Sequence, residues 1–83
     1  MSSEKVLSSE QCRAARAMLD WSREDLAAKS GVSRPTLADF ETAKRKPYDR
    51  TLSDIRHTFE AAGLEFIPEN GGGAGIRFRE RKG

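Results

Sequence analysis

The sequence predicts a small, mainly α-helical domain in which four short helices are followed by a C-terminal β-hairpin. Serines that can cap helices stand at three points, Ser8, Ser22 and Ser33, each just before a segment with apolar residues three or four positions apart. After Gly63 this period gives way to short alternating segments. A chain of 83 residues makes one small domain with a modest core, which favours binding over elaborate catalysis.

The first helix is expected to follow Ser8, whose spacing to Gln11 matches a capping box, and to run through "EQCRAARAMLD". Cys12, Ala15 and Leu19 share one face of this helix. Cys12 is the only cysteine, so the chain can form neither an internal disulfide nor a cysteine-based metal cluster. We therefore interpret Cys12 as a small buried hydrophobic residue, and we expect residues 1–6 to form a flexible N-terminal arm.

A second helix is predicted from about Arg23 to Ser30, because Ser22 and Asp25 repeat the capping spacing and Leu26 can point inward. Trp21 stands at the joint between the first two helices. It could stack on a ligand or a base, but a large apolar residue between two short helices more often fills the core. We interpret Trp21 as a core residue.

The stretch "AAKSGVSRPTLADFE" leaves almost no room for a loop between the second and third helices. Gly31 is suited to end the second helix because glycine adopts a positive φ without a Cβ penalty. Val32 is then expected to enter the core directly after the turn. Ser33 can cap the third helix, and Pro35 is tolerated in the first helical turn, where amides lack helical partners.

The third helix is predicted to cover roughly residues 34–43, with Leu37 and Phe40 pointing inward. Its opposite face is short, small and polar, and consists of Arg34, Pro35, Ala38, Asp39 and Thr42. A fourth helix follows Pro47 and ends at Gly63, with an inward stripe of Leu52, Ile55, Phe59 and Ala62. His57 lies off this stripe without a metal-binding neighbour, so we assign it no function.

The segments "LEFIPE" and "IRFR" flank the turn-rich "NGGGAG" and predict a hairpin within residues 64–83. Alternation places Leu64 and Phe66 on one face of the first strand, and Ile76 and Phe78 on the matching face of the second. "GGGAG" is a poor phosphate-binding loop because neither Lys-Ser/Thr nor a helical pattern follows it.

Charge is concentrated after the third helix. The chain carries 15 Lys and Arg against 13 Asp and Glu, a net charge of only +2. Within residues 44–50, however, four basic side chains accompany a single acid, Asp49. Such a segment can attract phosphate groups, although a solvated polar loop is the alternative. No apolar run approaches the roughly 18 residues of a membrane span, and no apolar signal segment follows the polar Met1–Lys5, so we expect a cytoplasmic protein.

Two short helices joined at Gly31, the second with a narrow polar face beside a basic loop, have the geometry needed to enter a DNA major groove. The stretch "WSREDLAAKSGVSRPTLADFETAKRKP" resembles the helix-turn-helix domains of the Cro and phage-repressor family, of the xenobiotic-response-element type. The resemblance covers roughly residues 7–62 and implies a repressor-like helix-turn-helix domain over residues 7–63.

In that family the third helix is the recognition helix, so the resemblance places Arg34, Pro35 and Asp39 on base edges. It implies backbone contacts from Arg23, Ser33, Thr36, Thr42, Lys44 and Lys46. Arg23 replaces a usual Gln, and "TA" at residues 42–43 replaces a common Asn-Gly. Pro35 suits a thymine methyl group and Asp39 could accept only from cytosine, so Arg34 is the strongest candidate for reading a base.

These features predict a sequence-specific DNA-binding transcriptional regulator that forms a homodimer on an inverted-repeat operator. The hairpin residues Leu64, Phe66, Ile76 and Phe78, with the exposed side of the fourth helix, are candidates for the dimer interface, with recognition helices about 34 Å apart. Alternatively, both strands pack only on their own helices. The expected partners are double-stranded DNA, a second copy and, as a further candidate, RNA polymerase.

A different class of function is also open: a protein-interaction module, such as an antitoxin or antiactivator, whose apolar hairpin binds a partner. No enzymatic activity, cofactor, metal or small-molecule ligand is expected, because the sequence offers no nucleophile with a nearby base and no cluster of metal ligands.

Overall fold

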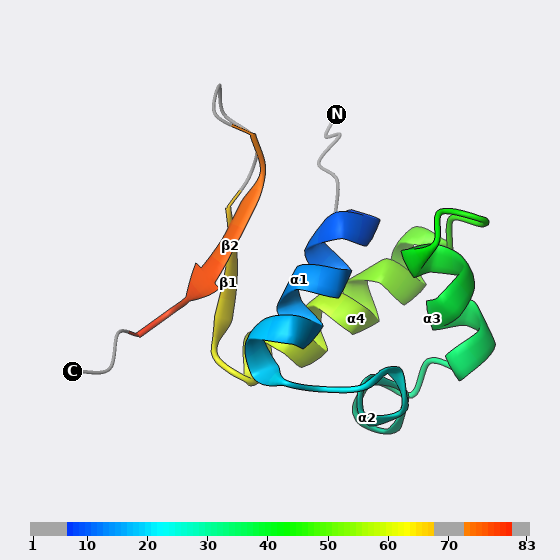
Figure 1. Cartoon of the computed structure of the whole chain (residues 1–83), viewed down its shortest axis with the longest axis horizontal. Coiled ribbons are helices and arrows are strands. Elements are labelled where there is room, and N and C mark those ends of the chain that lie inside the picture. The colour runs from blue at the N-terminus through cyan, green and yellow to red at the C-terminus, as the bar shows by residue number, and fades with distance from the viewer. Residues whose placement is uncertain (1–6, 68–72, 81–83) are drawn as a thin grey trace.

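The computed structural model describes residues 7–67 and 73–80 and contains four helices and one hairpin in those ranges (Figure 1). This confirms the predicted fold class. The elements are α1 (Ser9–Leu19), α2 (Arg23–Ser30), α3 (Arg34–Glu41), α4 (Asp49–Ala61), β1 (Leu64–Ile67) and β2 (Gly75–Phe78). The predicted flexible arm, residues 1–6, lies outside the described residues, as do residues 68–72, which include the first part of the predicted turn segment "NGGGAG".

Side-chain caps fix the starts of the first two helices, as predicted. Ser8 accepts from the backbone N–H of Gln11 at 3.0 Å, while the Gln11 side chain accepts from the backbone N–H of Ser8 at 3.0 Å. Ser22 and Asp25 form the same reciprocal pair at the start of α2, at 3.0 and 2.9 Å. Each box satisfies two amides that the helix itself leaves unpaired. The hydrogen bond from the Ser22 backbone also lowers the pKa of the Asp25 carboxyl.

The turn between α2 and α3 depends on Gly31, which has the predicted left-handed conformation with φ of 80°. Its N–H donates to the carbonyl of Ala27 at 2.9 Å and closes the end of α2. The end of α3 differs from the prediction, because the helix stops at Glu41 and Ala43 has φ of 62°. The N–H of Lys44 turns back to the carbonyl of Asp39 at 2.8 Å, which ends the helical pattern.

The core lies where the four helices meet and continues under the hairpin. Its buried apolar members are Leu7, Cys12, Ala15, Leu26, Val32, Leu37, Phe40, Leu52, Ile55, Phe59, Leu64 and Phe66. Trp21 is partly buried and stacks on Phe59 with ring centroids 5.7 Å apart, which confirms its interpretation as a core residue. Ala62, predicted to point inward, is exposed because α4 has already ended at Ala61.

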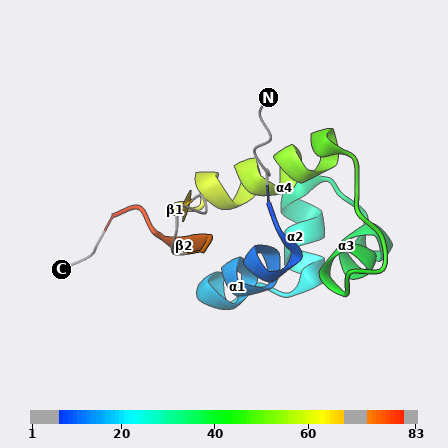
Figure 2. The same cartoon turned by 90° about the horizontal axis from the view of Figure 1, so that it is seen from above.

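The hairpin lies at the opposite end of the molecule from α3 in both views (Figures 1 and 2). Its strands are antiparallel, with Leu64 opposite Phe78 and Phe66 opposite Ile76. β1 packs against α4 and β2 against α1, so the hairpin extends the helical core. Leu64 and Phe66 are buried, whereas Phe78 is 48% exposed.

Candidate nucleic-acid interface

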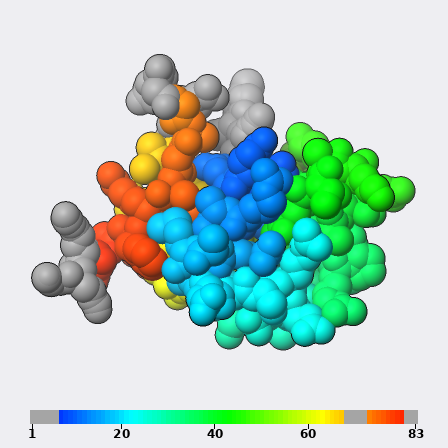
Figure 3. Space-filling view, viewed as in Figure 1, coloured from blue at the N-terminus to red at the C-terminus, as the bar shows by residue number. Residues whose placement is uncertain are grey.

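The start of α3 presents the predicted base-reading residues to solvent. Arg34 and Pro35 are exposed in the first turn, and Asp39 is half-buried about one turn further along. The Ser33 hydroxyl caps the helix, donates to the Thr36 hydroxyl at 2.9 Å and accepts from the Thr36 N–H at 3.4 Å. This cap holds the first turn of α3 in a fixed conformation, and α3 with the loop after it forms one side of the molecule (Figure 3).

The segment from Thr42 to Lys46, called the basic loop below, follows α3 and is exposed throughout. Its backbone is tied to the helix, because the N–H groups of Lys44 and Arg45 both donate to the carbonyl of Asp39, at 2.8 and 3.2 Å. The hydroxyl of Thr42 donates to the carbonyl of Ala38 at 2.8 Å. No ion pair within residues 7–67 and 73–80 engages the three basic side chains of this loop. The backbone of the basic loop is therefore fixed by hydrogen bonds, while its cationic side chains are exposed and accessible to a phosphate group.

A buried carboxylate at the end of α3, which the sequence did not reveal, connects three helices. Glu41 has a fully buried side chain and lies against α1 and α2. Arg16 donates from Nε to Oε2 at 2.8 Å and from Nη2 to Oε1 at 2.7 Å, which is a bidentate pair. The Cys12 thiol donates to Oε2 at 3.1 Å, and Arg13 donates to the backbone carbonyl of Glu41. These bonds lock the C-terminal end of α3 onto α1.

The hydrogen bonds determine the charge of Glu41. Burial opposes ionisation of the carboxyl, but hydrogen bonds from Arg16, Arg23 and Cys12 outweigh it and lower the pKa of Glu41 to about 2. The pKa of Arg16 is raised, chiefly by its hydrogen bonds to Glu41. Burial, followed by the hydrogen bond to Glu41, raises the pKa of the Cys12 thiol. Glu41 is therefore a carboxylate, and Cys12 a neutral thiol, at neutral pH.

Arg23, predicted to contact a phosphate, has a partner within the chain. Its Nε donates to Oε1 of Glu41 at 2.9 Å, while 39% of its side chain remains exposed. Arg23 therefore acts with Arg16 to pair the buried carboxylate of Glu41. Only the outer N–H groups of its guanidinium are left for a phosphate.

Two further residues near α3 were missed by the sequence analysis. Glu24, in the first turn of α2, forms an ion pair with Arg34. Tyr48 stands directly before α4, does not cap it with its side chain and is 85% exposed. The pairing of Glu24 depends on how two helices cross, so no local sequence pattern reveals it. For Tyr48 the available signal was its place in the polar stretch "KRKPYDR", which contains no other apolar side chain except Pro47.

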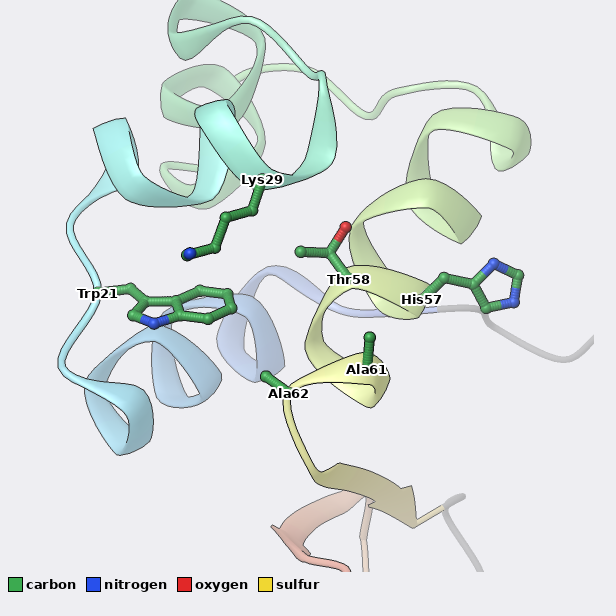
Figure 4. A pocket seen from close by; sticks show the side chains of 6 residues that line it. All are labelled: Trp21, Lys29, His57, Thr58, Ala61 and Ala62. Atoms are coloured by element: carbon green, nitrogen blue, oxygen red, sulfur yellow. The ribbon is translucent and has the colours of Figure 1, made fainter.

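An open pocket lies away from α3, between α2 and the C-terminal half of α4 (Figure 4). It is lined by Trp21, Lys29, His57, Thr58, Ala61 and Ala62. The ammonium group of Lys29 lies 5.2 Å from the centre of the Trp21 ring, a cation–π contact. None of the lining residues belongs to α3 or to the basic loop, so this pocket is separate from the candidate interface.

The four predicted dimerisation residues fall into two groups. Leu64 and Phe66 are buried in the core of their own chain, as the alternative arrangement of the hairpin expected. Ile76 is partly buried against the same core, and Phe78 is the most exposed of the four. An interface at the hairpin would therefore use Phe78, while Leu64 and Phe66 hold the hairpin on the helices.

Comparison with known proteins identifies the helical body. A search of curated proteins found no match, and in the described part of the chain no helix has the length and apolar character of a membrane span. The model of the helix-turn-helix family HTH_3 matches residues 13–61, which include all four helices apart from the first turn of α1. The match contains the turn at Gly31, the exposed face of α3 and the basic loop. The chain therefore belongs to this DNA-binding family, the Cro and phage-repressor type of helix-turn-helix protein.

Proposed function

We propose that this protein is a sequence-specific transcriptional regulator that inserts α3 into the DNA major groove. The observation that carries the proposal is the exposed first turn of α3, with Arg34 and Pro35, beside an exposed basic loop whose backbone is bonded to the same helix. In this arrangement Arg34 reads a guanine, Pro35 contacts a thymine methyl group and Asp39 accepts from a cytosine amino group.

The backbone contacts surround the recognition helix. Lys44 and Lys46 neutralise phosphates on one side of the groove, and the Thr36 hydroxyl can donate to a phosphate nearby. The hydroxyls of Ser33 and Thr42 can do so only after they leave their partners, the Thr36 hydroxyl and the Ala38 carbonyl. Arg23 contributes less than the family resemblance implied, because Glu41 already engages its Nε. Contacts of this kind set the register of α3 on the duplex, whereas the side chains of α3 select the sequence.

A homodimer on an inverted repeat follows from the size of the reading surface. One short helix contacts too few bases to select a single site in a genome. The hairpin, at the far end from α3, is our candidate interface through Phe78 (Figure 1). If the half-sites lie one helical turn apart, about 34 Å, the two protomers must be inclined to each other so that both α3 helices face the same side of the DNA. Two protomers joined end to end in a line would instead require half-sites that are further apart.

A protein-interaction module remains the second candidate function, because Phe78 offers an exposed aromatic surface that a partner could cover. Such a module could act as an antitoxin or antiactivator. Neither function uses an enzymatic step, a cofactor or a metal. We place the protein in the cytoplasm with DNA, and RNA polymerase is a further candidate partner for a bound regulator.

Selection from a random DNA library tests the proposal. The full chain is expected to enrich one sequence with two inverted half-sites, and its affinity for that sequence should fall steeply with salt. Arg34→Ala should weaken binding by about 1–3 kcal/mol and relax the preference at one guanine. A chain that enriches no sequence, or an Arg34→Ala variant with unchanged preference at every position, would contradict the proposal.

A further inference from the structure

An exposed ion pair joins the first turn of α2 to the first turn of α3. Oε2 of Glu24 lies 2.7 Å from Nη1 of Arg34, and the two side chains are 69% and 60% exposed. Exposed pairs of this kind contribute little to folding stability, because water screens the charges and both side chains lose rotamer freedom. A carboxylate in the first turn of α2 interacts favourably with the helix dipole, but that explains only the charge of Glu24 and not its contact with Arg34.

The geometry of the guanidinium suggests another role. Arginine carries five N–H donors in a planar fork, and a guanine is read by two donors aimed at its O6 and N7 atoms. Glu24 contacts only Nη1, so the edge formed by Nε and Nη2 remains available for a base. The carboxylate also restricts the rotation of a long side chain that would otherwise sample many rotamers.

The charge of Glu24 acts in a second way. It lies beside the proposed DNA-binding face, where a carboxylate repels the phosphates of any duplex, whatever its sequence. Its neighbour Asp25 is already engaged in the cap of α2 with Ser22. Glu24 therefore lowers affinity for every duplex and orients one contact that only the matching duplex can make. The repulsion alone leaves the ratio of specific to non-specific binding unchanged, and the orientation of Arg34 raises it.

We propose that Glu24 is a specificity-determining positioning residue, which holds the Arg34 guanidinium so that its free edge reads a guanine and whose charge lowers affinity for every duplex. This inference rests on the proposed function, because it requires Arg34 to contact DNA. Glu24 thereby affects the discrimination between bases without contacting a base itself.

The test measures the DNA affinity of the wild-type full chain and of Glu24→Gln on two duplexes. One is the selected operator, and in the other the G·C pair that Arg34 reads is replaced by an A·T pair. That guanine is the position at which Arg34→Ala loses its preference. Glu65→Gln is the matched control, because Glu65 forms a comparable exposed pair with Arg77 at 3.0 Å on the hairpin, far from α3 (Figure 1). Circular dichroism and thermal unfolding verify that each variant is folded.

We expect Glu24→Gln to bind random duplexes more tightly and to discriminate guanine from adenine about 3- to 10-fold less well. This is part of the about 5- to 150-fold discrimination that a bidentate contact supplies. In the Arg34→Ala background the same substitution should leave discrimination at that base unchanged, and Glu65→Gln should behave like the wild type.

Unchanged discrimination in Glu24→Gln, with binding intact, would overturn the role of Glu24 alone. A loss of discrimination that persists without Arg34 would also overturn it, since Glu24 would then act through another group. Failure of the wild-type chain to select any duplex would overturn the proposed function together with this inference.

Discussion

At the scale of single residues, the position of α3 depends on Glu41, a buried carboxylate whose two arginine partners stand on α1 and α2. The caps at Ser8 and Ser22 and the left-handed Gly31 follow local rules of helix geometry, and all three were predicted correctly. Glu41 stands 25 residues from Arg16, so its burial depends on how α1, α2 and α3 pack. Charged residues are rarely fully buried, and the sequence carries no local sign of this exception.

We predict that Glu41→Gln destabilises the domain by about 3 kcal/mol at neutral pH, because two arginines lose the carboxylate that they share. The lower part of the usual range for buried pairs is expected because Arg16 is 20% exposed and can be hydrated. Urea unfolding at pH 7 measures the difference. A variant as stable as the wild type would show that the cluster does not hold α3 in place.

The difference in unfolding free energy between the wild type and Glu41→Gln should depend on pH. The folded-state pKa of Glu41 is lowered from 4.5 to about 2, so its contribution to stability is complete above about pH 4.5 and is lost as the pH falls towards 2. The stability difference between wild type and Glu41→Gln should shrink over that interval. Unfolding measured at several pH values checks this, and a difference that stays constant down to pH 2 would contradict the pairing.

At the scale of the element, the existence and order of the helices followed from the sequence, but the end of α3 did not. Apolar spacing and caps predicted every helix, because these signals lie within the segment itself. The end of α3 depends on bonds from the following loop to Asp39 and on the left-handed backbone at Ala43. Alanine gives no sequence signal for that conformation, whereas glycine at 31 does.

We predict that Ala43→Gly raises the free energy of unfolding by up to about 1 kcal/mol, because glycine adopts positive φ without the strain that a Cβ adds. Gly31→Ala should have the opposite effect. A Cβ at Gly31 would meet no atom within 4 Å, so its cost comes from the backbone conformation alone. Thermal unfolding of both variants checks the pair, and a lower Tm for Ala43→Gly would be the contrary result.

The basic loop gives a prediction about DNA. Lys44→Gln and Lys46→Gln should each reduce the slope of log affinity against log salt by about 0.9, because each lost phosphate contact releases one counterion fewer. Lys29→Gln is the control, since Lys29 lines the pocket away from α3. Binding titrations at several salt concentrations measure the slopes. Equal slopes in the wild type and both loop variants would remove the loop from the interface.

At the scale of the whole molecule, the sequence predicted a hairpin but not its position. Alternation identified the paired faces of the strands, and the register places Leu64 and Phe66 opposite Phe78 and Ile76. Which of these residues would be covered by helices depends on the tertiary packing of β1 on α4 and of β2 on α1. Deleting the hairpin would remove Leu64 and Phe66 from the core and destabilise the domain. Substitution of one exposed hairpin side chain therefore tests dimer formation more specifically.

We predict that Phe78→Ser converts the proposed homodimer to a folded monomer, because this side chain is 48% exposed in the isolated chain. Sedimentation equilibrium measures the assembly. Tyr48→Ser serves as the control, since Tyr48 is more exposed but lies at the opposite end of α4 from the hairpin. A dimer of unchanged affinity in Phe78→Ser would move the interface elsewhere.

The central claim is that α3 and the basic loop form the surface that meets DNA. The most direct measurement is a nuclear magnetic resonance titration of the ¹⁵N-labelled full chain with the selected duplex, which reports on each backbone amide separately. We expect the largest shifts on Arg34, Thr36 and the amides of residues 42–46, and little change in those of β1 and β2. Largest shifts on the hairpin or around Trp21, with the amides of α3 unchanged, would contradict it.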